Sequence, residues 1–162
     1  MDKEKTKFAK NSLLKSANFD NDPMIQFIIL WIGFNALYDD GGGHEDKKVS
    51  RYFGANANTV VSLLERSNVK LKEVANFIDK TPQHAELSKV LKTRRSFLSP
   101  NPNDNSVDDF SQFIYQIRNN MFHAGKSWNQ EDEDKLLQMI NPVFKDMLSI
   151  FVSNSTPNGS TR

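Results

Sequence analysis

Cysteine is absent from the 162-residue sequence, and several chemistries are absent with it. Without a thiol the chain forms no disulfide, no thiolate metal site and no cysteine nucleophile. An excess of charge of one sign is also missing, because 21 lysines and arginines face 20 aspartates and glutamates, a formal net charge of +1. A chain so close to neutral does not bind nucleic acid over its whole surface, so any RNA contact must use a local basic patch.

Long apolar runs are missing as well. The most apolar stretch, residues 24–34, is interrupted by Gln26 and is too short to span a bilayer, so it predicts a buried core helix. The N-terminal region is charged well past Lys15 and contains no apolar segment of the kind that a secretory signal needs. We therefore expect a soluble, cytoplasmic protein without a membrane partner.

The chain has the length of one domain, and its apolar residues recur with helical spacing. We expect a single domain over residues 1–152 and a disordered tail over 153–162, where small polar residues dominate. No alternating pattern favours a strand, so the predicted class is all-α, with the apolar second helix in the middle of a bundle. Helices are predicted at residues 3–18, 23–38, 44–53, 58–65, 69–79, 85–98, 106–124 and from 127 or 129 to 152.

The helix predicted at 106–124 is the one that carries chemistry. Ser106 and Asp109 resemble a capping box at its start, and Gly125 supplies a stop at its end. On a wheel that turns by about 100° per residue, Arg118 and His123 flank the outward face on its two sides. The opposite face is apolar and predicts contact with the core through Phe110, Phe113, Ile114, Ile117, Met121 and Ala124.

Two aromatic residues, Tyr115 and Phe122, stand in the middle of that outward face, which is unusual for a helix side that meets only solvent. Two explanations are open. The face packs against another segment of the same chain, or it meets its own copy across a two-fold axis. We predict the second arrangement, a homodimer with Tyr115 and Phe122 in the interface, because it brings Arg118 and His123 of both subunits around one cleft.

The string Arg118-Asn119-Asn120-Met121-Phe122-His123, followed by Ala124-Gly125-Lys126, resembles the signature of the HEPN family, in which an arginine precedes a histidine by a few residues near a helix end. It is similar to the ApeA-like branch, where Arg-Asn-Asn, an apolar pair, His and Gly-Lys recur together. The second helix resembles that branch too, through Trp31, Asn35 and Tyr38. The resemblance implies a HEPN-type up-and-down bundle with a core of about four or five helices, extra short helices and dimerisation.

The same resemblance implies cleavage of RNA without a metal or another cofactor, and it assigns roles to single residues. His123 would exchange a proton with the ribose 2′-OH or the leaving 5′ oxygen, and Arg118 would stabilise charge on the phosphate. Asn119 would orient the imidazole or bind phosphate. The expected product is a 2′,3′-cyclic phosphate, and the expected setting is a toxin or phage-defence effector with a separate antitoxin or regulator. Supporting or RNA-binding candidates are Asn35, Asn120 and Lys126.

Simpler interpretations stay open beside this one. Arg118 is equally typical of a solvated or salt-bridged helix arginine, and His123 of a histidine that the helix dipole favours at a C-terminus. The alternative function is a non-catalytic HEPN module that binds nucleotide or RNA or scaffolds a partner; a third is a structural helical protein. Gly125 stands where one HEPN toxin group carries a tyrosine that its antitoxin modifies, so that regulation is not expected here.

Basic side chains gather in two further places. One is a candidate track for an RNA backbone, although such runs are more often solvated helix faces. It consists of Lys89, Lys92, Arg94 and Arg95. A weaker candidate consists of Lys47, Lys48 and Arg51. The preceding residues 41–43 are expected to form a flexible glycine connector, and His44–Asp46 we interpret as the start of a helix, with no metal site.

Overall fold

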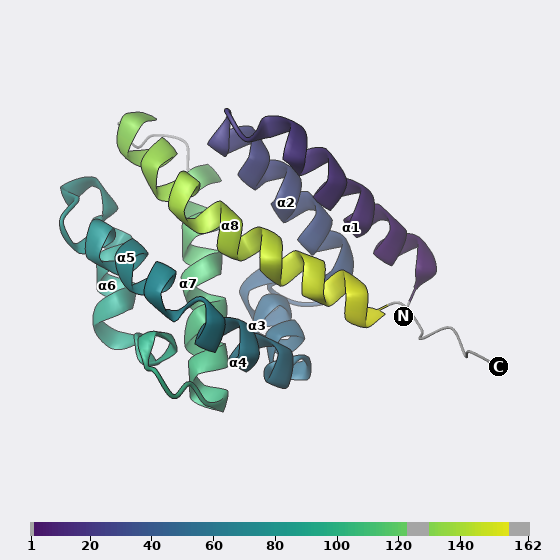
Figure 1. Ribbon diagram of the computed structural model, residues 1–162. Coiled ribbons are helices and arrows are strands. Elements are labelled where there is room, and N and C mark those ends of the chain that lie inside the picture. Colours follow the sequence, from purple (N-terminus) through teal and green to yellow (C-terminus); the bar gives the residue numbers. More distant parts are fainter. Residues whose placement is uncertain (1, 123–129, 156–162) are drawn as a thin grey trace.

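The computed structural model describes residues 2–122 and 130–155, without the side chains of Gln83 and Gln130. Within these ranges the chain forms eight α-helices, three short 3₁₀ helices and no strand, which confirms the all-α class. The α-helices are α1 (Lys3–Ser16), α2 (Pro23–Tyr38), α3 (Glu45–Ala55), α4 (Ala57–Arg66), α5 (Asn68–Asp79), α6 (Ala85–Thr93), α7 (Asp104–Phe122) and α8 (Gln130–Ser155) (Figure 1). The 3₁₀ helices are η1 (Ala17–Phe19), η2 (Pro82–His84) and η3 (Ser96–Leu98). None of the described helices is long and apolar enough to cross a bilayer.

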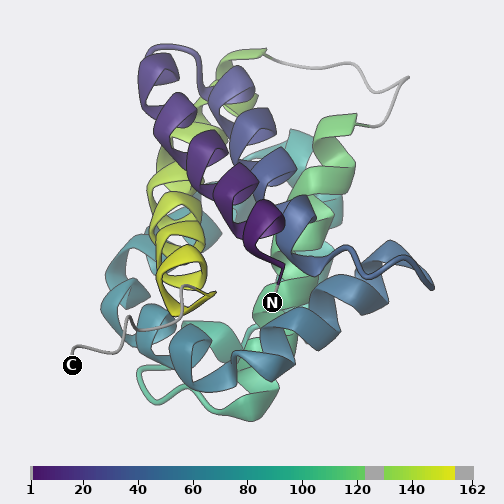
Figure 2. The same cartoon turned by 90° about the vertical axis from the view of Figure 1, so that its right-hand side faces the viewer.

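Two long helices organise the packing. α8 lies against α1, α2, α4 and α5, whereas α7 lies against α3, α4, α6 and η3 (Figures 1 and 2). Aromatic side chains connect the two groups through Phe34 of α2, whose ring centre is 5.9 Å from that of Phe144 on α8 and 5.7 Å from that of Phe53 on α3. Phe53 in turn lies 5.9 Å from Phe110 of α7. One continuous core therefore runs from α8 through α2 and α3 to α7.

The expectation that α2 lies in the middle of the bundle is only partly met, because one of its sides is partly exposed. α1 packs closely against α2 at Gly33, where an added Cβ would stand 2.7 Å from Cβ of Ser12. On another side of α2, the side chains of Ile25 and Ile32 remain 40% and 47% exposed. The apolar character of α2 therefore reflects a core on one side and a partly exposed apolar strip on another.

The helix expected over residues 85–98 ends early, at Thr93, and this corrects the prediction. Arg94 and Arg95 leave helical geometry, and η3 follows. The reason is the burial of Phe97, whose ring stacks 4.9 Å from that of Phe113 and lies 5.5 Å from that of Phe110. The break turns Phe97 toward α7. An uninterrupted helix would instead continue in the direction of α6.

α7 begins two residues before the predicted position, because the capping box is formed by a different pair. Oδ1 of Asn103 accepts hydrogen bonds from the N–H groups of Asn105 and Ser106, and the Ser106 hydroxyl oxygen accepts one from the N–H of Asn103. This reciprocal arrangement satisfies donors at the start of the helix. Asp109, the predicted second partner, instead accepts from the backbone N–H and the hydroxyl of Ser96. It thereby fixes η3 to α7.

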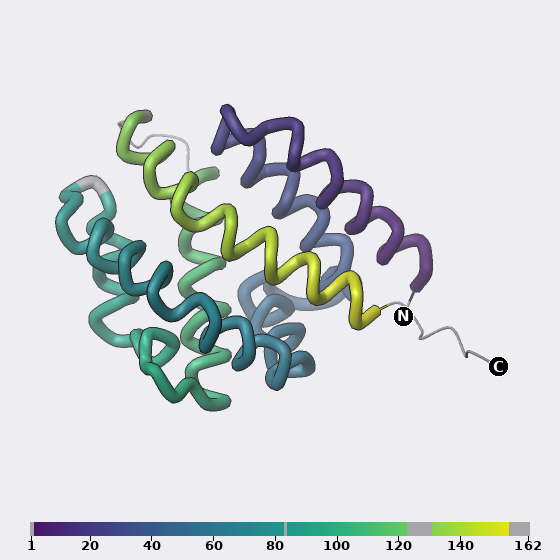
Figure 3. Tube along the Cα trace, in the orientation of Figure 1, coloured from purple at the N-terminus to yellow at the C-terminus, as the bar shows by residue number. Residues whose placement is uncertain are grey.

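α8 continues through Pro142 without a break, as the tube trace shows (Figure 3). Beside the proline, the Asn141 amide donates to the carbonyl of Pro23 at 2.9 Å and to the side-chain oxygen of Gln26 at 3.1 Å, which ties α8 to the first turn of α2. The helix extends to Ser155, three residues past the predicted domain boundary. The rest of the predicted tail, and the predicted start of α8 at 127 or 129, lie outside the described residues.

Candidate functional site

The apolar face of α7 packs into the core as the helical wheel predicts. Its described members are at most 8% exposed: Phe110, Phe113, Ile114, Ile117 and Met121. His123, Ala124 and Lys126 lie outside the described residues, so the structure gives no position for the predicted catalytic histidine. Arg118, at the border of the buried face and one turn before the end of α7, and its neighbour Asn119 are the predicted catalytic residues that the structure does place.

Arg118 is held by contacts to three side chains. Its Nη2 lies 3.3 Å from Oε2 of Glu45, the first residue of α3. Its Nη1 donates to Oδ1 of Asn119 at 3.1 Å, and its guanidinium carbon stands 5.1 Å from the centre of the Phe122 ring. The side chains of Arg118 and Glu45 are 29% and 30% exposed, so the ion pair is partly shielded from water. The cation is fixed in place while part of it still reaches solvent.

Glu45 is fixed in turn from α2. The Tyr38 hydroxyl donates to Oε1 of Glu45 at 2.6 Å. Burial, and then this bond to a carboxylate, raise the pKa of the Tyr38 hydroxyl well above its usual range, so the phenol stays protonated and remains a donor. We call the five residues Tyr38, Glu45, Arg118, Asn119 and Phe122 the Arg118 site. It joins three helices, α2, α3 and α7, at one point.

Glu45 is the residue of this site that the sequence does not reveal. His44–Asp46 begins α3 as predicted, and acidic residues in a first helical turn need no other explanation. The separation of Glu45 from Arg118 is 73 positions, and nothing in the local pattern of either segment indicates that they pair. The resemblance on α2 did single out Tyr38, although not its contact with Glu45.

The three predicted asparagines have different surroundings. Asn119 is half-buried and contacts Arg118 directly. Asn120 is buried, and its Oδ1 accepts a hydrogen bond from the Gln116 amide at 2.9 Å, which favours support of the helix over contact with RNA. Asn35 is half-buried on α2, one turn before Tyr38. The structure thus brings Asn119 into the Arg118 site and leaves Asn120 inside the fold.

The two aromatics predicted to form a dimer interface differ in their exposure. Tyr115 is half-buried and packs against the core of its own chain, which is the first of the two explanations for that face. Phe122 is 47% exposed and covers one side of the Arg118 guanidinium. Phe122 is therefore the more available of the two for contact with a second subunit.

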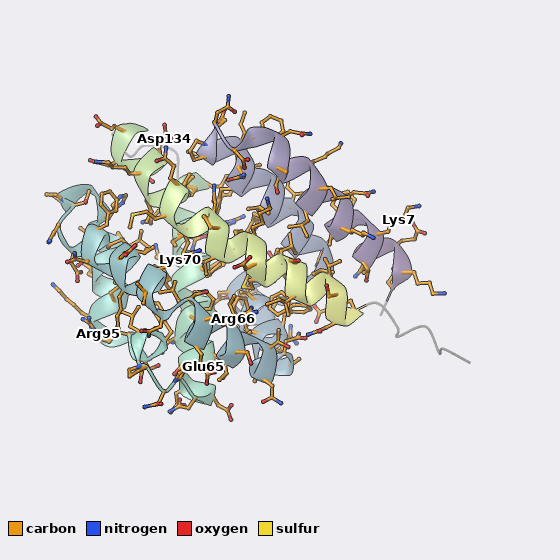
Figure 4. The ribbon with its side chains drawn as sticks, viewed as in Figure 1. Lys7, Glu65, Arg66, Lys70, Arg95 and Asp134 are labelled. Carbon is orange, nitrogen blue, oxygen red and sulfur yellow. The ribbon has the colours of Figure 1, made fainter. Side chains whose placement is uncertain are left out.

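The densest basic stretch is divided by the break after α6. Lys92 is exposed on the last turn of α6. Arg94 turns toward α7, with its Nη1 3.2 Å from Oδ2 of Asp108. Arg95 points elsewhere, to the lower left in Figure 4, and lines a separate hollow beside α5. Lys89 pairs with Glu86 on its own helix, at 3.2 Å. The predicted track is therefore not one continuous surface.

The weaker basic group lies closer to the Arg118 site, on α3 and the loop before it. Lys48 binds Asp39 at 2.9 Å, and this hydrogen bond is the main cause that lowers the pKa of the Asp39 carboxyl. Arg51 lies 3.6 Å from Asp40 in a pair that is largely exposed. The loop between α2 and α3 projects from one side of the bundle (Figure 2) and is fastened by these contacts. Lys47 makes no ion pair with any described residue.

The Arg118 site offers a permanent cation whose planar fork suits phosphate or carboxylate. Among the described residues, no three His, Asp or Glu side chains gather as a metal site would require. Comparison of the chain with protein-family models, with curated proteins and with solved structures finds no match.

Proposed function

We propose that this protein is a metal-independent endoribonuclease of the HEPN type, which cleaves RNA to leave a 2′,3′-cyclic phosphate. The observation that supports the proposal most is the position of Arg118 within the Arg-Asn-Asn-x-x-His string. It lies near the end of a helix in an all-α fold, partly exposed, and contacts on three sides hold its guanidinium. A cation that is fixed before substrate arrives needs little reorganisation of its own side chain to stabilise developing charge.

The chemistry of the proposal uses two residue types that are suited to it. Arg118 binds the scissile phosphate and stabilises the additional negative charge as the 2′ oxygen attacks phosphorus. His123 moves the proton, from the 2′-OH or to the departing 5′ oxygen, because an imidazole takes up and releases protons near neutral pH. Asn119 supports Arg118 through the hydrogen bond at 3.1 Å.

Glu45 has a double role in this proposal. Its carboxylate, oriented by the Tyr38 hydroxyl, holds the Arg118 guanidinium in one place. The same carboxylate lies where its negative charge opposes a bound phosphate, so RNA must share or displace it. Glu45 is a positioning residue, because it acts on the substrate through Arg118.

Assembly and setting belong to the proposal as well. A homodimer through the α7 face around Phe122 would place two Arg118 sites near one cleft, as the resemblance implies. We propose RNA as the substrate, a separate antitoxin or regulator chain as a partner, and a toxin or phage-defence role as the setting. The proposed cellular compartment is the cytoplasm.

One observation favours the alternative, a non-catalytic HEPN module that binds nucleotide or RNA or scaffolds a partner. The Nη2 of Arg118 already has a carboxylate partner, and structural ion pairs use arginine in the same way. In a binding module the ion pair of Arg118 with Glu45 would serve only to join α3 to α7.

A cleavage assay in EDTA separates the two functions. Wild-type protein is incubated with single-stranded and hairpin RNAs, beside Arg118→Ala, His123→Ala and the exposed control Lys70→Ala (Figure 4). The proposal expects cleavage by the wild type and the control, and a loss of at least about a hundredfold in both site variants. Equal cleavage by His123→Ala, or none by the wild type, would contradict it.

A further inference from the structure

A cleft of about 820 Å³ lies along α3, next to the Arg118 site, and the proposed chemistry does not use it. Its walls come from the loop between α2 and α3, from one face of α3 and from α7. The side chains that matter are Lys47, Ser50 and Arg51 of α3 and Gln112 of α7, with the backbone of Gly42–Gly43 on the loop side. A cleft of this size lies within the range of small-molecule binding sites. We call it the α3–α7 cleft.

The charged groups of the α3–α7 cleft favour an anion. Lys47 and Arg51 are one turn apart on the same face of α3, and both are exposed. Lys47 has no ion-pair partner in the described part of the chain, and Arg51 meets the carboxylate of Asp40 across 3.6 Å, with both side chains about 60% exposed. An ion pair so exposed contributes little and exchanges readily for another anion. The cleft therefore presents two cations against one loosely held carboxylate.

The neutral groups of the cleft suit a ligand that carries more than a phosphate. The Gln112 amide has no hydrogen-bond partner among the described residues, so it is free to donate and accept. A Cβ placed on Gly42 would meet nothing within 4 Å, so a ligand can approach this backbone closely. A nucleotide combines the two requirements, because its phosphate matches Lys47 and Arg51 and its base edge matches an amide.

The α3–α7 cleft adjoins the Arg118 site through the first residues of α3. His44, which lines the cleft, immediately precedes Glu45, the partner of Arg118. At the other end, the hydroxyl of Ser50 donates to Asp108, and Asp108 also binds Arg94. α3 thus connects the two arginines, because Glu45 at its start pairs with Arg118 and Ser50 donates to the carboxylate that binds Arg94.

We infer that the α3–α7 cleft binds the nucleotides of a single-stranded RNA that adjoin the phosphate held by Arg118. Lys47 and Arg51 contact the flanking phosphates, and Gln112 meets a base edge. This inference rests on the proposed function for the identity of the strand. It adds a binding surface away from the Arg-Asn-Asn-x-x-His string, in residues that the string does not include. A free nucleotide carries the same phosphate and base groups, so the experiment must distinguish binding of an RNA strand from binding of a free nucleotide.

The test measures binding with an RNA that cannot be cut. The probe is a fluorescein-labelled, 2′-O-methylated RNA of about twelve nucleotides, titrated in EDTA with the full chain and read by fluorescence anisotropy. Lys47→Ala/Arg51→Ala is compared with Arg66→Ala/Lys70→Ala, which removes one arginine and one lysine from exposed positions on α4 and α5 (Figure 4). Circular dichroism of both variants is the control that their helices are kept.

We expect Lys47→Ala/Arg51→Ala to raise the Kd for this RNA at least about tenfold and to lower the slope of log Kd against log salt by about 1.4, the value for two lost contacts to single-stranded phosphates. The control changes Kd less than about threefold. Equal effects of the two variants would overturn the inference. So would AMP or UMP that displaces the RNA as effectively as unlabelled RNA does, because the cleft would then be a site for free nucleotide.

Failure of the proposed function and failure of the cleft inference give different combinations of binding and cleavage results. If the wild type binds the probe through Lys47 and Arg51 but cleaves no RNA in EDTA, the proposed nuclease function is contradicted. The inference that the cleft binds RNA is not. If the wild type cleaves RNA but binds the probe equally well without Lys47 and Arg51, the inference that the cleft binds RNA is contradicted. The proposed nuclease function is not. The two measurements therefore judge the two claims separately.

Discussion

At the scale of single residues, the contact between Arg118 and Glu45 changes how the Arg-Asn-Asn-x-x-His string is understood. The string alone indicates an arginine that is available to bind a phosphate. In the structure this arginine already has a carboxylate partner, 3.3 Å away, and that carboxylate is oriented by a buried phenol that stays protonated. In the proposed function, the affinity of the site for RNA would therefore depend on Glu45 as well as on Arg118.

Replacement of Glu45 by glutamine tests this dependence. The new amide would keep an oxygen that accepts from Tyr38, but the negative charge that opposes a phosphate would be lost, so we expect the Kd for RNA to fall about threefold. Anisotropy titration with non-cleavable RNA measures the change. Glu65→Gln, an equal change of charge at an exposed position of α4 (Figure 4), is the control and should leave Kd unaltered. Weaker RNA binding by Glu45→Gln would show that the carboxylate does not compete with phosphate.

The candidate site could be predicted from the sequence only where a local pattern carries it. The spacing of apolar residues on one helix places Arg118 at the border of the core, and the structure agrees. The partner of Arg118 could not be found in this way, because Glu45 belongs to a distant segment and has an ordinary role as a first-turn acid. A contact between distant segments depends on how α3 crosses α7, which helical periodicity does not encode.

At the scale of helices, the sequence likewise predicts what depends on a local pattern and misses what depends on contacts between distant segments. Helices with a strong apolar stripe, such as 69–79, agree with the structure to within a residue at each end. The helix predicted over 85–98 fails where Phe97 packs on α7, since tertiary burial there overrides the local pattern. The start of α7 shifts because Asn103, rather than Ser106, caps it.

The close contact of α1 with α2 gives a prediction at this scale. Gly33→Ala would place a methyl group 2.7 Å from Cβ of Ser12 and 3.3 Å from Cδ2 of Leu148, so α1 or α8 must move. We expect it to lower the free energy of unfolding by about 1–3 kcal/mol in chemical denaturation. Gly54→Ala is the control, because it adds a methyl group in open space on α3 and should raise stability by up to about 1 kcal/mol. Equal effects would mean that the α1–α2 approach is not tight.

At the scale of the whole molecule, the question is whether the Arg118 site works alone or in a pair. Tyr115 packs within its own chain, so the aromatic face of α7 is smaller than the sequence suggests. Phe122 remains 47% exposed and its ring lies against the guanidinium of Arg118. The proposed dimer therefore depends chiefly on Phe122.

Sedimentation velocity tests the proposed dimer. We expect the wild type to sediment as a dimer at micromolar concentration and Phe122→Asp to sediment as a folded monomer, since a carboxylate cannot be buried in an apolar contact without a large cost. RNA cleavage in EDTA should fall together with the dimer fraction. A wild type that is monomeric at every concentration tested, yet cleaves RNA, would exclude the shared cleft.

We propose that Arg118 and His123 cleave RNA through the 2′-OH without a metal. The most direct measurement compares one RNA with the same sequence that carries a single 2′-deoxyribose at the mapped cleavage position, both in EDTA, with the products identified by mass spectrometry. We expect cleavage of the unmodified RNA to a 2′,3′-cyclic phosphate and no cleavage at the deoxyribose. Cleavage at the deoxyribose, or a product that ends in a 3′-hydroxyl, would contradict it.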